Sequence, residues 1–331
     1  MDAFLITDVR IFDGQKTTER GSVLVENGEI SKVSSSPISF NGTTISKPGH
    51  TLIPGLIDTH IHADGANPIA LPQSLRFGVT TACDMHNENY HIATLRKQIE
   101  EAEGDCADLK TTSFAATIDM GWPMPVVLAA HDTPEVREEI AAWPKLTTPE
   151  TGREYVRERV REGVDYIKLM HESGAFMGAS FNKPSVELQK AVIDEAHKNG
   201  LVTVAHATCI ADTVEILEAG VDGLTHMFID QPADQRVIDA YKKNGAHCNP
   251  TLACMGSSTT EGQQLQEKFA HDPRVQRFLG EAERERMCMC MGFAKENGKV
   301  EHAYESVRRL KKAGVPIVMY VVPVRSSWYG S

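Results

Sequence analysis

Residues 201–228, LVTVAHATCIADTVEILEAGVDGLTHMF, contain one complete strand–helix–strand unit. Apolar residues at 202–207 and 223–227 predict two short strands, and the helical spacing of apolar residues over 211–218 predicts the helix between them. Gly220 then provides the stop signal that ends the helix. Units of this kind build a parallel sheet covered by helices.

The same alternation continues along the chain from residue 51 onward. Eight strand candidates are found, at residues 52–62, 79–85, 111–116, 166–170, 202–207, 223–227, 247–252 and 316–321. Helical periodicity fills most of the gaps, most clearly at residues 90–103, 150–162, 186–198, 211–218 and 302–312. Eight such units match a closed (β/α)8 barrel, for which roughly 250 residues are typical. No GxGxxG or GxxxxGK[ST] motif follows a strand, so the usual nucleotide-binding signatures are excluded.

The first fifty residues follow a different pattern. Apolar and polar residues alternate over 4–12, 22–26 and 30–33, and Asn27-Gly28 marks a turn. This pattern predicts a small antiparallel sheet. We therefore expect a small β domain at residues 1–50 and a barrel at residues 51–331.

Composition limits the classes of function. The 331 residues are 41% hydrophobic and 24% charged, and they contain no run of about 18 apolar residues. The net charge of -11 repels phosphate backbones and anionic lipid, so we expect no nucleic acid and no membrane partner. Seven cysteines without a regular framework, and no signal-peptide pattern, predict a cytoplasmic protein with reduced thiols. The sequence leaves a homo-oligomer open.

Two histidines stand two residues apart in PGLIDTHIHADG, residues 54–65. His60 and His62 lie near the end of the first predicted barrel strand, with Cα atoms ~6.6 Å apart and side chains on one face. Both imidazoles can therefore meet one metal ion. An isolated pair of this kind is more often two polar residues at a solvated strand end. The carboxyl end of a barrel strand is where such enzymes place their chemistry, and this position favours the metal.

Three more polar residues lie on later strands. His206 and His226 occupy equivalent strand ends, and Lys168 lies inside the apolar strand at 166–170. A single such histidine is more often a hydrogen-bonded core residue, but four at the strand ends of one barrel converge on one cavity. A buried ammonium group is costly without a partner, so Lys168 needs a chemical reason. The competing interpretation is a structural lysine that extends its ammonium to solvent.

These motifs resemble the metal-dependent amidohydrolase superfamily, most closely its imidazolonepropionase-like and prolidase-like members. The resemblance runs through PGLIDTHIHADG, FGVTTACDM, VDYIKLMHESG, LVTVAHA and AGVDGLTHMF. It implies an α/β fold, a (β/α)8 TIM barrel with a small N-terminal β-sandwich-like domain. It also implies one or two divalent metal ions, with Zn2+ expected, and a carboxylated lysine in two-metal members. The ligands that it implies are His60, His62, Lys168, His206 and His226.

Two further residues are candidates for substrate binding. Asp84 on the second predicted strand and His171 after the fourth can face the same barrel mouth. For Asp84, a structural role as acceptor for loop amides is at least as strong an interpretation.

The end of the sequence departs from the family pattern. The resemblance implies an aspartate at the end of strand eight that transfers a proton, but AGVPIV continues as MYVVPVRSSWYGS. The last aspartate is Asp272 and the last acid is Glu305, so the catalytic residue stays unknown. The end of the barrel and the C-terminal strands of the small sheet are also missing from the pattern. We therefore expect a truncated or altered C-terminus.

The expected function is a metal-dependent hydrolase that acts on carbon–nitrogen bonds other than peptide bonds, in a cyclic amide or N-acyl small molecule. A metal ion acidifies a water ligand and polarises the carbonyl in such a site. One alternative is a catalytically impaired or dead metal-binding protein of the same fold. Another is a prolidase-like dipeptidase, which differs only in its substrate.

Overall fold

The computed structural model describes residues 3–102, 104–294 and 298–318. The chain divides into two compact units, Met1–Leu56 and Ile57–Ser331. Along the described residues, no helix has both the length and the apolar character needed to cross a membrane.

The first unit is a mixed sheet with the strand order β3-β2-β1-β4, and β5 also pairs with β1. Its strands are β1 (Phe4–Phe12), β2 (Thr17–Glu26), β3 (Glu29–Ser34), β4 (Thr43–Ser46) and β5 (Thr51–Leu52). Strands β1, β2 and β3 pair antiparallel, as the alternation predicts. The sheet also contains β4 and β5, which the sequence pattern did not predict in it, and both run parallel to β1. A long connection, made of β2, β3 and residues 35–42, separates β1 from β4. Because of this length, β4 can pair with β1 in the parallel direction.

The second unit contains parallel strands in two groups. The order is β6-β7-β8 in one group and β12-β11-β10-β9 in the other. The strands are β6 (Leu56–Ile61), β7 (Val79–Asp84), β8 (Asp108–Thr111), β9 (Tyr166–Met170), β10 (Val202–His206), β11 (Gly223–Thr225) and β12 (His247–Asn249). Parallel bridges join Ala116 to Leu169 of β9, and Ile317 to Cys248 of β12. This α/β arrangement of parallel strands confirms the predicted fold class.

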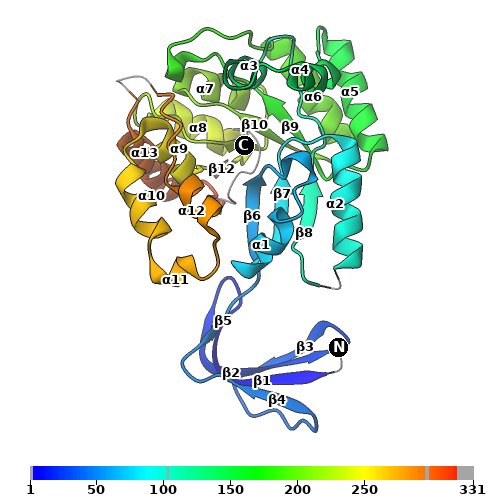
Figure 1. Ribbon diagram of the computed structural model, residues 1–331, viewed down its shortest axis with the longest axis vertical. Helices are drawn as coiled ribbons and strands as arrows, with labels where there is room; N and C mark the ends of the chain where they lie inside the picture. Colours follow the sequence, from blue (N-terminus) through cyan, green and yellow to red (C-terminus); the bar gives the residue numbers. More distant parts are fainter. Residues whose placement is uncertain (1–2, 103, 295–297, 319–331) are drawn as a thin grey trace. The chain divides into compact units, whose positions relative to one another are not determined.

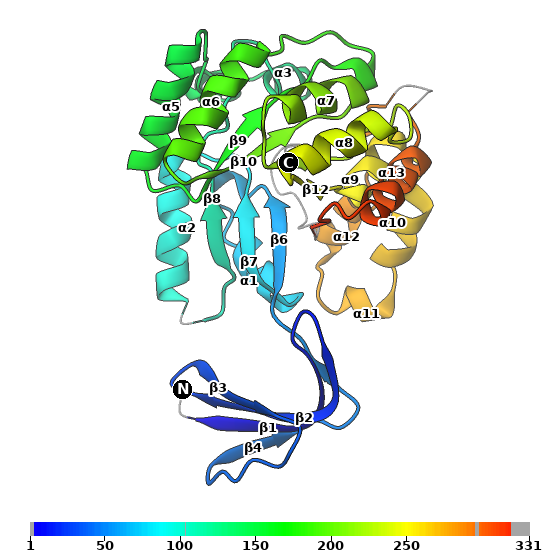
Figure 2. The ribbon, with the colours of Figure 1, turned by 180° about the vertical axis from the view of Figure 1, so that it is seen from behind.

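Helices alternate with these strands and lie around their outside, as Figures 1 and 2 show for α2, α5, α6, α7 and α8. The α-helices are α1 (Ala70–Arg76), α2 (Asn89–Glu101), α3 (Met124–Ala130), α4 (Pro134–Ala142), α5 (Pro149–Arg161), α6 (Val186–Lys198), α7 (Ile210–Glu218), α8 (Gln235–Asn244), α9 (Leu252–Thr259), α10 (Gln263–Ala270), α11 (Pro273–Gln276), α12 (Glu281–Met287) and α13 (Val300–Lys312). Short 3-10 turns occur at Asp64–Ala66 and Ala175–Met177.

Four predicted strands have other bounds in the structure. The strand predicted at 52–62 is divided into β5, which pairs with β1, and β6, and the strand predicted at 223–227 ends at Thr225. The strand predicted at 111–116 ends at Thr111, because Ser113 adopts a φ of 57°, which extended backbone cannot contain. The strand predicted at 247–252 ends at Asn249, and Leu252 already begins α9. The strand predicted at 316–321 is described only through residue 318, and its remainder lies outside the described residues.

The core of the second unit lies between strands and helices. Ile167 and Leu169 of β9, and Leu224 of β11, are almost completely buried together with Val192 and Ile193 of α6. Residues 167 and 169 therefore face the helices, and the alternation of a strand turns Lys168 and Met170 to the opposite side. This alternation places polar side chains inside the ring of strands.

Candidate metal centre

The five ligands predicted from the sequence line one cavity. Its walls include His60 and His62 at the end of β6, Lys168 of β9, His206 at the end of β10 and His226 directly after β11. The four histidines lie at or directly after the carboxyl ends of their strands, and Lys168 lies in the middle of β9. The carboxyl ends of parallel strands meet on the same side of a sheet. The tertiary structure thus brings together residues that are up to 166 positions apart in sequence.

The histidine rings are close enough to share an ion. Nε2 of His60 lies 3.2 Å from Nε2 of His62. The ring centroids of His60 and His226 are 4.9 Å apart, and those of His206 and His226 are 4.7 Å apart. Two nitrogen ligands bound tetrahedrally at 2.0–2.1 Å would lie about 3.3 Å apart. The donor set and its spacing therefore fit a divalent metal ion.

Neighbouring side chains hold two of these rings in place. Oγ1 of Thr251 lies 2.7 Å from Nδ1 of His226, and Oε2 of Glu172 lies 3.3 Å from Nε2 of His206. A partner on one ring nitrogen fixes the orientation of a histidine ligand. The backbone at His226 is also constrained, because its φ is 73° and its N–H donates to the carbonyl of Asn249. Left-handed backbone of this kind concentrates at functional sites.

Lys168 is buried, with 1% of its surface exposed, and Nζ donates a hydrogen bond to Oγ1 of Thr225. Burial lowers the pKa of this amine to about 7. A large fraction is therefore neutral at physiological pH, which is the nucleophilic form of an amine. The lysine does not extend its ammonium to solvent.

A sequence model of the amidohydrolase family matches residues 51–322. The chain belongs to the amidohydrolase family. This match confirms the resemblance that the sequence motifs indicate. Members of the family are hydrolases that generally bind divalent metal ions. No curated protein matches the sequence.

Solved structures share the fold of this amidohydrolase. A Xaa-Pro dipeptidase with bound methionine is 20% identical, with a TM-score of 0.71, and the match covers 96% of this chain and 79% of that one. The ochratoxinase of A. niger is 18% identical, with a TM-score of 0.68 and coverages of 97% and 76%. Phenylurea hydrolase B is 16% identical, with a TM-score of 0.69 and coverages of 97% and 74%. These matches confirm the barrel fold.

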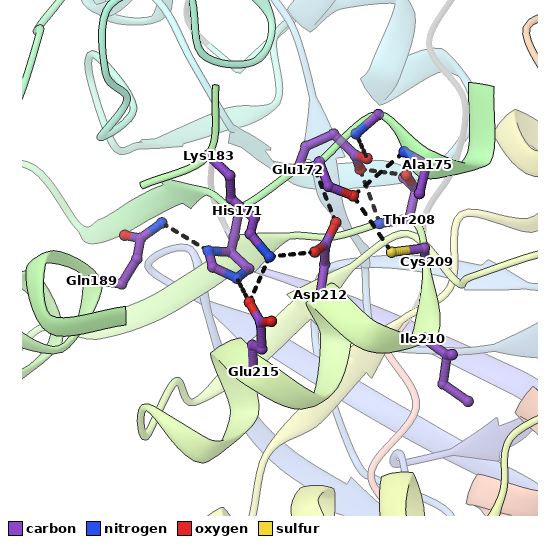
Figure 3. Close-up of polar contacts among 12 residues, drawn as sticks. His171, Glu172, Ala175, Lys183, Gln189, Thr208, Cys209, Ile210, Asp212 and Glu215 are labelled. Atoms are coloured by element: carbon purple, nitrogen blue, oxygen red, sulfur yellow. Dashed lines mark hydrogen bonds and ion pairs between the residues drawn. The ribbon is translucent and has the colours of Figure 1, made fainter. Parts of the chain in front are cut away.

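Sequence reasoning missed Glu172 in this amidohydrolase, although it lies only two residues after β9. Its side chain is buried, and it accepts hydrogen bonds from the backbone N–H groups of Gly174 and Thr208, at 2.7 and 3.1 Å, and from the Thr208 hydroxyl. Figure 3 shows the contact with Thr208. Burial raises the pKa of Glu172 to about 7. The motif MHESG carried a signal, since an acid directly after a buried strand needs partners.

His171 is not one of the described residues that line the cavity. Its Nε2 lies 3.2 Å from Oε2 of Glu215, and these two residues with Asp212 form a group that could hold a metal ion. However, Nζ of Lys183 lies 2.7 Å from Oδ1 of Asp212 and 2.5 Å from Oε2 of Glu215 (Figure 3). The ammonium already provides the positive charge there. This group ties α7 to the loop after β9, and we assign it a structural role.

Asp84 also lies apart from the described cavity lining. Its carboxylate accepts hydrogen bonds from Nδ2 of Asn87 at 2.7 Å and from the backbone N–H of His86 at 3.4 Å. Of the two interpretations from sequence, the structural acceptor for loop amides is the one that these contacts support. Asp84 holds the loop that carries His86, which does line the cavity.

Proposed function

We propose that this amidohydrolase is a metal-dependent hydrolase that cleaves carbon–nitrogen bonds other than peptide bonds, in a cyclic amide or N-acyl small molecule. The observation that carries the proposal is the convergence of four imidazoles and a buried lysine on one cavity, with two Nε2 atoms 3.2 Å apart. Ligands of this type bind divalent ions, with Zn2+ as the first candidate.

His60, His62, His206 and His226 would hold one or two ions. Such an ion supplies Lewis acidity and acidifies a water ligand toward a pKa of about 7. Glu172 and Thr251 keep the rings of His206 and His226 oriented for this task.

Lys168 would contribute as a carbamate. Its neutral amine attacks CO2, a nitrogen–carbon bond forms, one C=O π bond opens, and the nitrogen releases one proton. The product is an anionic oxygen ligand in place of a cation. The low pKa of the buried amine supports this reaction at neutral pH.

A second candidate function is supported by the lining of the cavity. Among the described lining residues, none is an aspartate or glutamate. Loss of a positioned general acid or base typically costs a factor of about 10² to 10⁴ in rate. A catalytically impaired metal-binding protein of the same fold is therefore the alternative.

One experiment separates these possibilities. The full chain is purified after growth with zinc, its metal content is measured by elemental analysis, and turnover is followed on a panel of anilides, lactams, N-acyl amino acids and dipeptides. We expect at least about one equivalent of metal, loss of metal in His60→Ala and His226→Ala, and no loss in the surface control His271→Ala. Turnover of a non-peptide amide supports the hydrolase. Metal without any turnover supports the binding protein, and less than about a tenth of an equivalent in the parent contradicts both.

A further inference from the structure

His86 is held rigidly at the wall of the cavity. It follows β7, and only 3% of its surface is exposed. The backbone N–H of Ala115 donates to its Nδ1 at 3.0 Å. The ring of Trp143 packs edge-on against it, with centroids 4.6 Å apart and an interplanar angle of 75°, and Phe114 lies at 5.9 Å. These contacts leave the imidazole one orientation.

The same contacts determine which nitrogen of His86 carries the proton. Because Nδ1 accepts a hydrogen bond, the proton of the neutral ring is on Nε2. Burial lowers the pKa of His86 to about 4, so the ring is neutral at physiological pH. Nε2 is buried and has no hydrogen-bond partner in the described part of the chain. A buried donor without an acceptor is unfavourable. Because His86 lines the cavity, an acceptor on a ligand bound there would satisfy its Nε2–H.

The rest of the cavity wall is mostly apolar. It includes Trp122, Val126, Val127, Phe176 and Phe293. Trp122 stacks on the ring of His206, with centroids 4.8 Å apart and an interplanar angle of 25°. An apolar group packed against Trp122 would therefore lie beside a proposed metal ligand, where the scissile bond must be.

The charges of the wall restrict the ligand further. Of the described lining residues, none is an arginine, an aspartate or a glutamate, and Lys168 is engaged by Thr225. Away from the proposed metal ligands, a free carboxylate would meet an apolar wall without a guanidinium partner, which is unfavourable. A dipeptide carries such a carboxylate, and a neutral amide does not.

We propose that His86 is a substrate-positioning residue whose Nε2–H donates to an oxygen of an uncharged amide or carbamate, and that an aromatic or branched apolar group of this substrate packs against Trp122 and its neighbours Val126 and Val127. This inference rests on the proposed function, because it names the substrate class of the same cavity. It disfavours dipeptides as substrates.

Binding of probes to the full chain tests the proposal independently of turnover. Titration calorimetry on the chelator-treated protein compares 4-nitroacetanilide, which is neutral, with 4-acetamidobenzoate, which is an anion of similar shape. We expect the neutral probe to bind at least about tenfold more tightly. His86→Phe keeps a ring but removes the donor, and it should weaken binding of the neutral probe by about five- to tenfold. His86→Gln retains an N–H near the position of Nε2, and it should restore binding to within about threefold of the parent.

The surface control His271→Phe should bind as the parent does. Equal binding of the two probes, or binding by His86→Phe within twofold of the parent, would overturn the proposal. If His86→Phe does not fold, as judged by its melting transition, His86→Gln is compared with His86→Ala. If both variants lose the same affinity for the neutral probe, the positioning role is overturned. Probe binding that depends on His86, without turnover of any amide, supports this inference and refutes the proposed hydrolase.

Discussion

Replacement of Lys168 by methionine should stabilise the metal-free protein. Burial lowers the pKa of this lysine from 10.5 to about 7 in the folded chain. Each pKa unit corresponds to about 1.4 kcal/mol, so burying the ammonium form costs on the order of 5 kcal/mol. Methionine has a similar length and no charge, so Lys168→Met removes this penalty. It also removes the hydrogen bond to Thr225, worth about 1 kcal/mol. We expect a net gain of about 2–4 kcal/mol in the free energy of unfolding at pH 7.

The gain should depend on pH in a defined direction. Below pH 7 the folded and unfolded forms of the parent both carry the proton, and the full penalty is present. Between pH 7 and 10.5 the unfolded parent binds more protons than the folded one, so the stability of the parent rises with pH. This rise amounts to about 2 kcal/mol between pH 7 and 9. The difference between variant and parent should therefore shrink by this amount.

Equilibrium unfolding in urea, followed by tryptophan fluorescence after treatment with a chelator, measures both quantities. Lys190→Met serves as the control, because Lys190 is exposed and pairs with Asp194 on the surface of α6. This control should change stability by less than about 1 kcal/mol at either pH. A variant Lys168→Met that is less stable than the parent at pH 7, or whose advantage is the same at pH 7 and 9, would refute the burial argument.

Three further predictions concern the site and its surroundings. Reconstitution of the metal-free protein with zinc should reach two equivalents only when bicarbonate is present, as elemental analysis can show. Lys168→Ala should stay below two equivalents with or without bicarbonate. If this variant binds two equivalents and bicarbonate has no effect, the carbamate is contradicted. Glu172→Gln should lower metal affinity by about 10- to 100-fold in competition with a chromophoric chelator, because the side chain orients His206; unchanged affinity would exclude that role. Lys183→Met should lower the free energy of unfolding by about 3–5 kcal/mol, because it leaves the carboxylate of Asp212 buried without its cation. The metal content of this variant should stay at the parental level. A loss of metal would instead place Asp212 and its neighbours in the metal site.

Short stretches of sequence were sufficient to predict helices and strands whose caps and apolar patterns lie within the stretch itself. The helix predicted at 186–198 is α6, because Ser185 caps its first turn and a regular apolar face packs inward. The strand predicted at 166–170 is β9, an apolar run completely covered by its neighbours. The direction of β4 and β5, and the early ends of β8 and β12, depend on how distant segments meet, which no local window contains.

The sequence by itself indicated the five candidate ligands. The four histidines lie at or next to the ends of predicted strands, which meet on one side of a parallel sheet, and the family resemblance added Lys168. The alternation of side chains along a strand also predicts the direction of His171. Because Lys168 and Met170 face the cavity, His171 turns to the opposite side, toward α7. Only the tertiary structure decided that His86 joins the cavity while Asp84 supports its loop. That outcome depends on the amide of Ala115 and the ring of Trp143, which reach His86 from 29 and 57 residues away. Contacts between residues so far apart in the chain exist only after the barrel has formed, and they alone set the direction of a buried hydrogen-bond donor.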